Sequence, residues 1–282
     1  MISSLLYLLI GVQIYNFYGI IKILWLIFTI FEGCMSSERE NITAIRELAE
    51  RYNNRCYFEK DPVVFPRRFY SLMQEWKATL KDVEIAAVIA AHLAWGRRDM
   101  IVRDISRAMD EMGWRPYEYV MKGNYRDEDK SLHRTIKWSE FAKICLNLKR
   151  FYEREESLEV LTPNEMRVKI YGQKSDANCA NKKIHMLRRW MVRDDGIVDL
   201  GVWKRIKPCE LIIPLDTHVH SSAVRMGITE RKSADIKTAL EITKFLLKCF
   251  PSDPCKGDFA LFAYSVRMRE EAEEKNKKRN CK

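Results

Sequence analysis

One short segment carries most of the residue types that could do chemistry. The run IIPLDTHVHSSAVRMGI at 212–228 begins apolar, breaks at Pro214 and continues with an aspartate and two histidines. Asp216 stands where a helix N-cap is expected, and Gly227 where that helix ends. A capping aspartate has a fixed position, which suits a carboxylate that must stabilise positive charge. The plainer interpretation is structural, with Asp216 capping the helix and the apolar residues after it packing.

The spacing Asp216-x-His218-x-His220 offers a metal site as one interpretation. It resembles the opening of the amidohydrolase barrels, in which two histidines at a strand end bind zinc. The resemblance implies further ligands downstream, yet only 62 residues follow His220 and none is a histidine. The other histidines of the chain form no second cluster (His92, His133, His185). We therefore rank metal-dependent hydrolysis through His218 and His220 lowest and predict no metal site.

The same residues match a second sequence motif more fully. LDTHV at 215–219, Arg225 and Gly227-Ile228 resemble a segment of the helix-hairpin-helix DNA glycosylases, of which endonuclease III is the familiar member. That resemblance implies that Asp216 is the catalytic carboxylate. Breaking an N-glycosidic bond builds positive charge on the sugar, and a fixed carboxylate stabilises that charge and can activate the nucleophile. The resemblance also implies double-stranded DNA with a damaged or mispaired base as the substrate.

Members of that superfamily that also nick the strand use a lysine, which attacks the sugar carbon and forms a Schiff base. The candidates here are Lys182 and Lys183, which lie 34 and 33 residues before Asp216. This spacing is longer than in endonuclease III and nearer that of the archaeal 8-oxoguanine glycosylases. Helical spacing turns Lys183 toward the interior and Lys182 away from it. Both stay candidates, against the alternative of two surface lysines in a basic helix.

Three further segments extend the resemblance to a bacterial family of uncharacterised proteins, itself similar to this superfamily. They are LAWGRR at 93–98, LRRWMVR at 187–193, and Asp253-Pro254 with DFALF at 258–262. Together with the Asp216 segment they cover most of residues 51–266. Lys182 fits the motif register of this family.

Two features of the glycosylase superfamily are missing. The Leu-Pro-Gly-x-Gly hairpin, whose backbone N–H groups hold a DNA phosphate, is absent, and only Gly172, with Lys174 and Ser175, stands near its place. The iron–sulfur loop is also absent, because Cys249 and Cys255 supply two thiols where four are needed. We therefore expect no cofactor and no iron–sulfur cluster.

Without the hairpin, binding to DNA must come from positively charged side chains. The chain carries a formal net charge of +10, and residues 166–193 hold eight basic residues and one acidic residue, enough to line a phosphate track. Trp95 and Trp190 could stack an extruded base, although single tryptophans in apolar helices are more often core. The alternative function is a helical nucleic-acid-binding module without catalysis, and no protein partner can be inferred. The predicted DNA-contact residues are Lys174, Arg188, Arg189, Arg193, Trp95, Arg97, Arg98 and His218.

Residues 1–33 form a separate hydrophobic segment. Twenty-three of the first 31 residues are apolar and Lys22 is the only charge among them, which is enough for a membrane helix. Met35 opens a polar, start-like stretch, so the alternative is an upstream start codon that is not used. The eight cysteines include no short CxxC pair, which favours a reduced compartment. We expect a cytoplasmic protein, tethered to a membrane only if residues 1–33 insert.

From residue 36 to residue 282 the pattern predicts an all-α architecture, and the resemblance implies a helix-hairpin-helix glycosylase-like pair of helical domains. Apolar residues recur at helical spacing, and sustained β alternation is absent. The stretch 81–95 is apolar all round, which predicts a buried helix. Residues 61–69, with two prolines, are expected to form a loop. The other helices are expected at 42–49, 100–112, 138–151, 182–192, from 216, at 234–250 and at 258–274, with 161–180 the least regular stretch.

Overall fold

The computed structural model describes residues 38–265. The chain divides into two units between Ala44 and Ile45. In the first unit the described residues, 38–44, are helical, and Thr43 Oγ1 donates a hydrogen bond to Arg39 O over 3.0 Å. None of the helices in the described part of the chain is both long and apolar enough to cross a membrane. The hydrophobic segment predicted at 1–33 lies outside the described residues.

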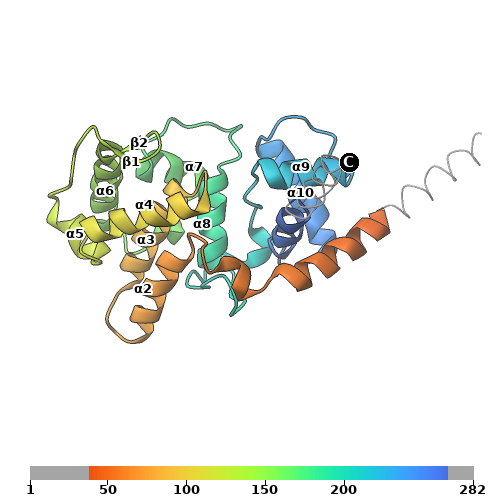
Figure 1. The fold of residues 1–282 in the computed structure, drawn as a ribbon, viewed down its shortest axis with the longest axis horizontal. Helices are drawn as coiled ribbons and strands as arrows, with labels where there is room; N and C mark the ends of the chain where they lie inside the picture. Colours follow the sequence, from red (N-terminus) through yellow and green to blue (C-terminus); the bar gives the residue numbers. More distant parts are fainter. Residues whose placement is uncertain (1–37, 266–282) are drawn as a thin grey trace, which may run out of the picture. The chain divides into compact units, whose positions relative to one another are not determined.

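The second unit is mainly helical, as predicted, with one small antiparallel hairpin (Figure 1). In the hairpin Ser131 pairs with Lys137, and His133 pairs with Ile136. Residues 45–52 and 256–265 are also helical. The bounds are η1 Arg55–Phe58, α2 Val64–Gln74, α3 Leu80–Leu93, α4 Arg98–Glu111, α5 Pro116–Lys122, β1 Ser131–His133, β2 Ile136–Lys137, α6 Trp138–Tyr152, η2 Leu158–Val160, α7 Pro163–Glu165, η3 Met166–Ile170 (a π-type turn), α8 Lys182–Val192, η4 Pro208–Glu210, α9 Thr217–Arg225 and α10 Ile236–Cys249.

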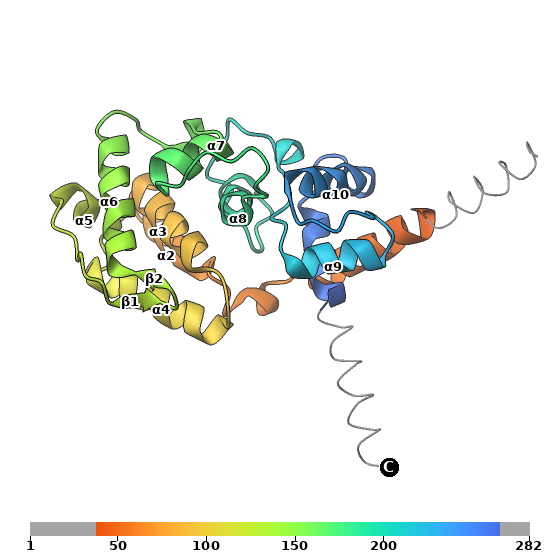
Figure 2. The same ribbon diagram turned by 90° about the horizontal axis from the view of Figure 1, so that it is seen from above.

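Helix α3 is the central element of this unit. Thr79 and Asp82 close its first turn in a capping box, and ten of its fourteen residues are buried. It packs against α2, α4, α5 and α8, so no side of the helix is left to solvent. The expectation of a buried helix at 81–95 is confirmed up to Leu93, and the exposed Trp95 lies beyond its end. The helix ends at Leu93, and Gly96 follows with a φ of 101°, a conformation that favours glycine. In Figure 2, α8 lies between the group α2–α6 and the pair α9 and α10.

The prediction of a loop at 61–69 is wrong, because α2 begins at Val64. Pro66 lies in the first turn of this helix, where the backbone N–H groups have no partner within the helix, so a proline removes nothing there. Phe65, Pro66 and Phe69 are buried. The proline pair therefore marks the start of a helix and not a connection.

A buried carboxylate ties α3 to three distant segments. The Glu84 side chain accepts hydrogen bonds from the Tyr152 hydroxyl (2.8 Å), the Ser157 hydroxyl (2.6 Å), the Leu158 amide and the Trp203 indole N–H (2.7 Å). Burial raises the pKa of Glu84, and these donors oppose the shift. With four donors on two oxygens, Glu84 fixes the helix in place.

The segment 161–181 leads from η2 to α8, and the sequence predicts residues 161–180 to be the least regular stretch. It contains α7 and η3, followed by non-helical residues up to Asn181. The Arg167 side chain spans this connection, with Nε donating to Lys174 O (2.7 Å) and Nη1 to Asn181 Oδ1 (3.0 Å). One arginine therefore holds the turn that leads into α8.

Candidate functional site

Asp216 is the N-cap of α9, as the sequence predicts. Its Oδ1 accepts hydrogen bonds from the backbone N–H groups of His218 and Val219, both at 2.9 Å. Leu215 before it is buried, and Asp216 itself is half-buried. Among residues 38–265, no hydrogen bond or ion pair uses Oδ2. One oxygen of this carboxylate is therefore fixed by the helix, and the other is available.

Lys182 is the first residue of α8. Its Nζ donates a hydrogen bond to the backbone oxygen of Ala94, the C-cap of α3, over 3.1 Å. This bond places the amine at the C-terminal end of α3, directly before Trp95. The start of one helix and the end of another thus position Lys182.

The charges of both Lys182 and Asp216 act on the buried carboxylate of Asp258. Asp258 lies in the helical stretch 256–265, is 4% exposed, and accepts a hydrogen bond on Oδ2 from Arg189 Nη1 over 2.7 Å. Burial raises the pKa of Asp258 to about 6; Arg189 and Lys182 oppose this shift, whereas the charge of Asp216 adds to it. Asp258 therefore lies within electrostatic range of both candidate catalytic residues.

Asp258 is not among the site residues predicted from the sequence. The available signal was an aspartate followed directly by the apolar run FALF at 259–262, since a charged residue at the start of such a run is expensive to bury without a partner. Its Oδ1 is buried and makes no hydrogen bond among the described residues. The side chain is therefore only half satisfied.

Two predicted DNA-contact residues meet over one aromatic ring beside Asp216. The His218 ring contacts Phe262 edge-on, with centroids 5.9 Å apart, and the Arg98 guanidinium lies 5.8 Å from the same ring. Arg98 also donates to Tyr57 O (3.3 Å), and His218 Nδ1 lies 3.2 Å from Ser265 Oγ. The ring of Phe262 therefore joins the start of α4 to the start of α9.

Lys183 occupies a different environment from its neighbour. Its Nζ lies 3.2 Å from His92 Nδ1 and 4.0 Å from the centre of the Tyr171 ring. Burial, and then the nearby charge of Arg167, lower the pKa of Lys183 to about 8. Burial and Lys183 together lower the pKa of His92 to about 3. The predicted inward orientation of Lys183 is confirmed, and its amine loses a proton more readily than an ordinary lysine.

Trp95 is an accessible aromatic residue next to Lys182. Its side chain keeps a residue exposure of 39%, and Arg134 stacks on the indole at 4.5 Å. The His133 ring meets it edge-on, and His133 Nε2 donates to Trp95 O (2.9 Å) while Nδ1 contacts Asp104 Oδ2 (2.8 Å). Trp190, by contrast, is fully buried, so a base cannot stack on it and that interpretation is wrong.

The predicted DNA contacts of Arg189 and Arg193 are also wrong. Both side chains are buried and paired with carboxylates inside the unit. Arg189 binds Asp258, and its Nε lies 3.5 Å from Asp199; Arg193 donates to Asp253 (2.8 Å) and to Asp199. Because breaking these pairs would leave buried carboxylates uncompensated, the two guanidinium groups are structural and do not face a phosphate.

The remaining predicted contacts lie at least partly in solvent. Lys174 is exposed, in the connection before α8. Arg97 is exposed and pairs with Asp99 (2.7 Å). Arg188 is half-buried and donates to Leu161 O over 3.0 Å. Contact of these three side chains with DNA stays a prediction.

The histidine pair of the metal interpretation does not converge. His218 and His220 are two residues apart in α9, which turns their side chains about 200° from each other. His220 Nε2 lies 2.8 Å from Arg231 O, whereas His218 contacts Ser265. Between residues 38 and 265 there is no group of three or more histidine, cysteine, aspartate or glutamate side chains placed to hold a metal ion.

Comparison with known proteins identifies the family to which the chain belongs. No match was found among the curated proteins, and none among the solved structures. One family model matches residues 61–176 and 162–267, which together make up more than half of the chain and include every residue of the candidate site. The chain belongs to the family described as "Protein of unknown function (DUF2400)".

Proposed function

We propose that this protein binds double-stranded DNA and hydrolyses the N-glycosidic bond of a damaged or mispaired base, with Asp216 as the catalytic carboxylate. The observation that carries the proposal is that the buried Asp258 lies within electrostatic range of both Asp216 and Lys182. Asp216 caps α9, Lys182 is the first residue of α8, and Asp258 lies in the helical stretch 256–265. A fixed carboxylate is what base removal needs, and an amine within electrostatic range would add strand nicking.

The chemistry assigns a task to each group. The C1′–N bond breaks, and its electron pair leaves with the base, which takes up a proton. The free Oδ2 of Asp216 stabilises the positive charge that develops on the sugar. A water oxygen then forms the new bond to C1′ and gives one proton to the carboxylate. In the second, separately testable part of the proposal, the neutral amine of Lys182 or Lys183 forms the bond to C1′ in place of water and loses one proton. The C1′–O4′ bond of the sugar then breaks, its electron pair stays on O4′, which takes up a proton, and the protonated Schiff base between C1′ and the lysine nitrogen remains.

Support for DNA as the partner comes from the surface near this cluster. The chain has a formal net charge of +10, and Arg98 and the partly exposed Trp95 lie by the start of α8 and α9. A cation can contact a phosphate, and an accessible indole can stack a base.

The first test is Asp216→Asn with Asp235→Asn as its matched control. Both aspartates are N-caps, because Asp235 accepts from the Thr238 N–H at the start of α10. Asparagine caps a helix about as well as aspartate, so Asp216→Asn should keep its stability within about 0.5 kcal/mol. Asp235→Asn also loses the ion pair with Arg231 (2.8 Å) and should be less stable than the wild type by about 1 kcal/mol, so it controls for the loss of a capping charge and for a small loss of stability. On a panel of duplexes with oxidised, deaminated and mispaired bases, Asp216→Asn should lower the rate of base release by about 100-fold or more. DNA affinity should be unchanged, and Asp235→Asn should match the wild type.

Two outcomes would contradict parts of this proposal. Equal base release by both variants would remove Asp216 from the chemistry. No base release by the wild-type protein, with salt-dependent duplex binding intact, would favour the nucleic-acid-binding module without catalysis. Borohydride trapping on abasic duplexes tests the amine: an adduct that is lost in Lys182→Gln or in Lys183→Gln names the nucleophile, and an adduct that survives both excludes them.

A further inference from the structure

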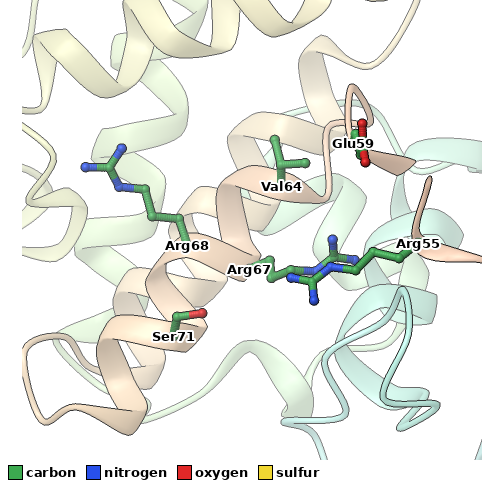
Figure 3. Close-up of a pocket in the computed structure, with 6 residues that line it drawn as sticks. All are labelled: Arg55, Glu59, Val64, Arg67, Arg68 and Ser71. Carbon is green, nitrogen blue, oxygen red and sulfur yellow. The ribbon is translucent and has the colours of Figure 1, made fainter. Parts of the chain in front are cut away.

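A pocket between η1 and α2 is lined by three arginines and one glutamate (Figure 3). Its volume is about 350 Å³, within the range of small-molecule sites. Helix α2 contributes one face, on which the lining residues recur at spacings of three and four, and η1 with the chain after it supplies the opposite wall. The lining residues are Arg55, Glu59, Val64, Arg67, Arg68 and Ser71.

The charges in this pocket are unbalanced. Within the described part of the chain, neither Arg55 nor Arg67 forms an ion pair. In Figure 3 the two side chains run toward one another from opposite walls, and burial and then the charge of Arg55 lower the pKa of Arg67. Glu59 is the single acidic residue of the lining. The charges of Asp199, Asp61 and Asp195 oppose the lowering of the Arg67 pKa only in part. Two guanidinium groups that repel each other favour a bound anion.

Arg67 and Arg68 are held in position without an anion. Arg67 Nη2 donates to the backbone oxygen of Val198, and Asp195 Oδ1 fixes that loop by accepting from the N–H groups of Ile197, Val198 and Asp199 (3.0, 2.9 and 3.1 Å). Arg68 stacks on the Trp114 ring at 4.0 Å, and in Figure 3 its guanidinium group points away from Arg55 and Arg67, so these two are the candidate phosphate ligands. Side chains that are already fixed lose little entropy when they bind.

We propose that this pocket is a binding site for a phosphate group. Planar guanidinium groups match phosphate oxygens with paired hydrogen bonds, and the pocket has room for the sugar that a phosphate ester carries. None of its residues belongs to the Asp216 cluster, so the inference goes beyond the proposed function and does not depend on it. The phosphate can belong to a free phosphorylated compound or to the DNA backbone.

Calorimetric titration of the full-length protein with inorganic phosphate and with thymidine monophosphate tests the site. Arg55→Gln is the informative variant, because Arg55 is exposed and makes no side-chain hydrogen bond among the described residues, so the fold should persist. Arg154→Gln is the matched control, since Arg154 is likewise exposed and without a partner in the described part of the chain. We expect the Kd for both probes to rise about tenfold in Arg55→Gln and to stay within about twofold in Arg154→Gln.

A duplex-binding arm identifies the source of the phosphate. If Arg55→Gln also weakens duplex binding about tenfold, the pocket holds a backbone phosphate. If duplex binding is unchanged while both probes bind more weakly, the pocket holds a free phosphorylated compound. Absence of binding of both probes to the wild-type protein, or equal binding by Arg55→Gln and Arg154→Gln, overturns the site whatever the outcome for base release.

Discussion

Replacing Lys183 by methionine should raise the free energy of unfolding at pH 7. The ammonium group is held between His92 and the Tyr171 ring, and its pKa is lowered from 10.5 to about 8. At 1.36 kcal/mol per unit, this shift sets an upper bound of about 3 kcal/mol on what the folded protein loses by keeping the charge there. Solvent still reaches part of the side chain, and methionine gives up the cation–π contact, so we expect a gain of about 1–2 kcal/mol.

The pH dependence follows from the same shift. Between pH 8 and pH 10.5 the unfolded chain holds a proton on Lys183 that the folded protein has released. The wild-type protein therefore gains stability as pH rises through this window, and the advantage of Lys183→Met shrinks to near zero by its upper end. Urea unfolding followed by circular dichroism at pH 7, 8, 9 and 10 measures this difference directly.

Lys182→Met is the matched control in the next position. It loses the 3.1 Å hydrogen bond to Ala94 O and should lower stability by about 1 kcal/mol. The reasoning is refuted if Lys183→Met lowers stability at pH 7 as much as this control does. At pH 7.5 a pKa of 8 leaves about a quarter of the amine neutral, against about one part in a thousand for an ordinary lysine. Refutation would therefore also remove the physical case for Lys183 as a nucleophile.

Two further predictions concern the scaffold. Glu84→Leu should lower the free energy of unfolding by about 3 kcal/mol or more, because its four buried donors lose their acceptor, and urea unfolding measures the loss. Gly201→Ala should cost at least about 2 kcal/mol more than Gly196→Ala. Both glycines have a φ above 60°, but a Cβ at Gly201 would lie 2.8 Å from the Asp194 Cα, whereas one at Gly196 meets nothing within 4 Å. Equal losses in the two variants would show that Asp194 moves aside.

Local signals predicted the helices well. The observed bounds of α8 equal the predicted 182–192, and those of α6 differ by one residue at the C-terminal end. Apolar periodicity and capping residues lie within the segment they describe, so one sequence reveals them. The expectation failed at α2, where Pro66 was interpreted as a break although the first turn of a helix accommodates it.

The candidate site was only partly predictable, because its electrostatics depend on distant contacts. Asp216 was found, since an N-cap is a local feature. Asp258 was missed, because its partner Arg189 lies 69 residues away. Arg189 and Arg193 were assigned to DNA because a buried arginine and an exposed one look alike in a basic helix. The aspartates at 195 and 199, two and six residues after Arg193, were the available sign that these arginines are paired within the protein.

Helix α8 carries lysines in its first turn and arginines toward its C-terminal end. Arg189 and Arg193, toward its C-terminal end, balance buried carboxylates, a task that needs a charge which persists without water. In its first turn, the environment of Lys183 favours release of the amine proton. An amine nucleophile must be neutral when it attacks. The distribution of arginine and lysine along α8 is therefore a reason to look for chemistry at its N-terminal end and not along its basic face.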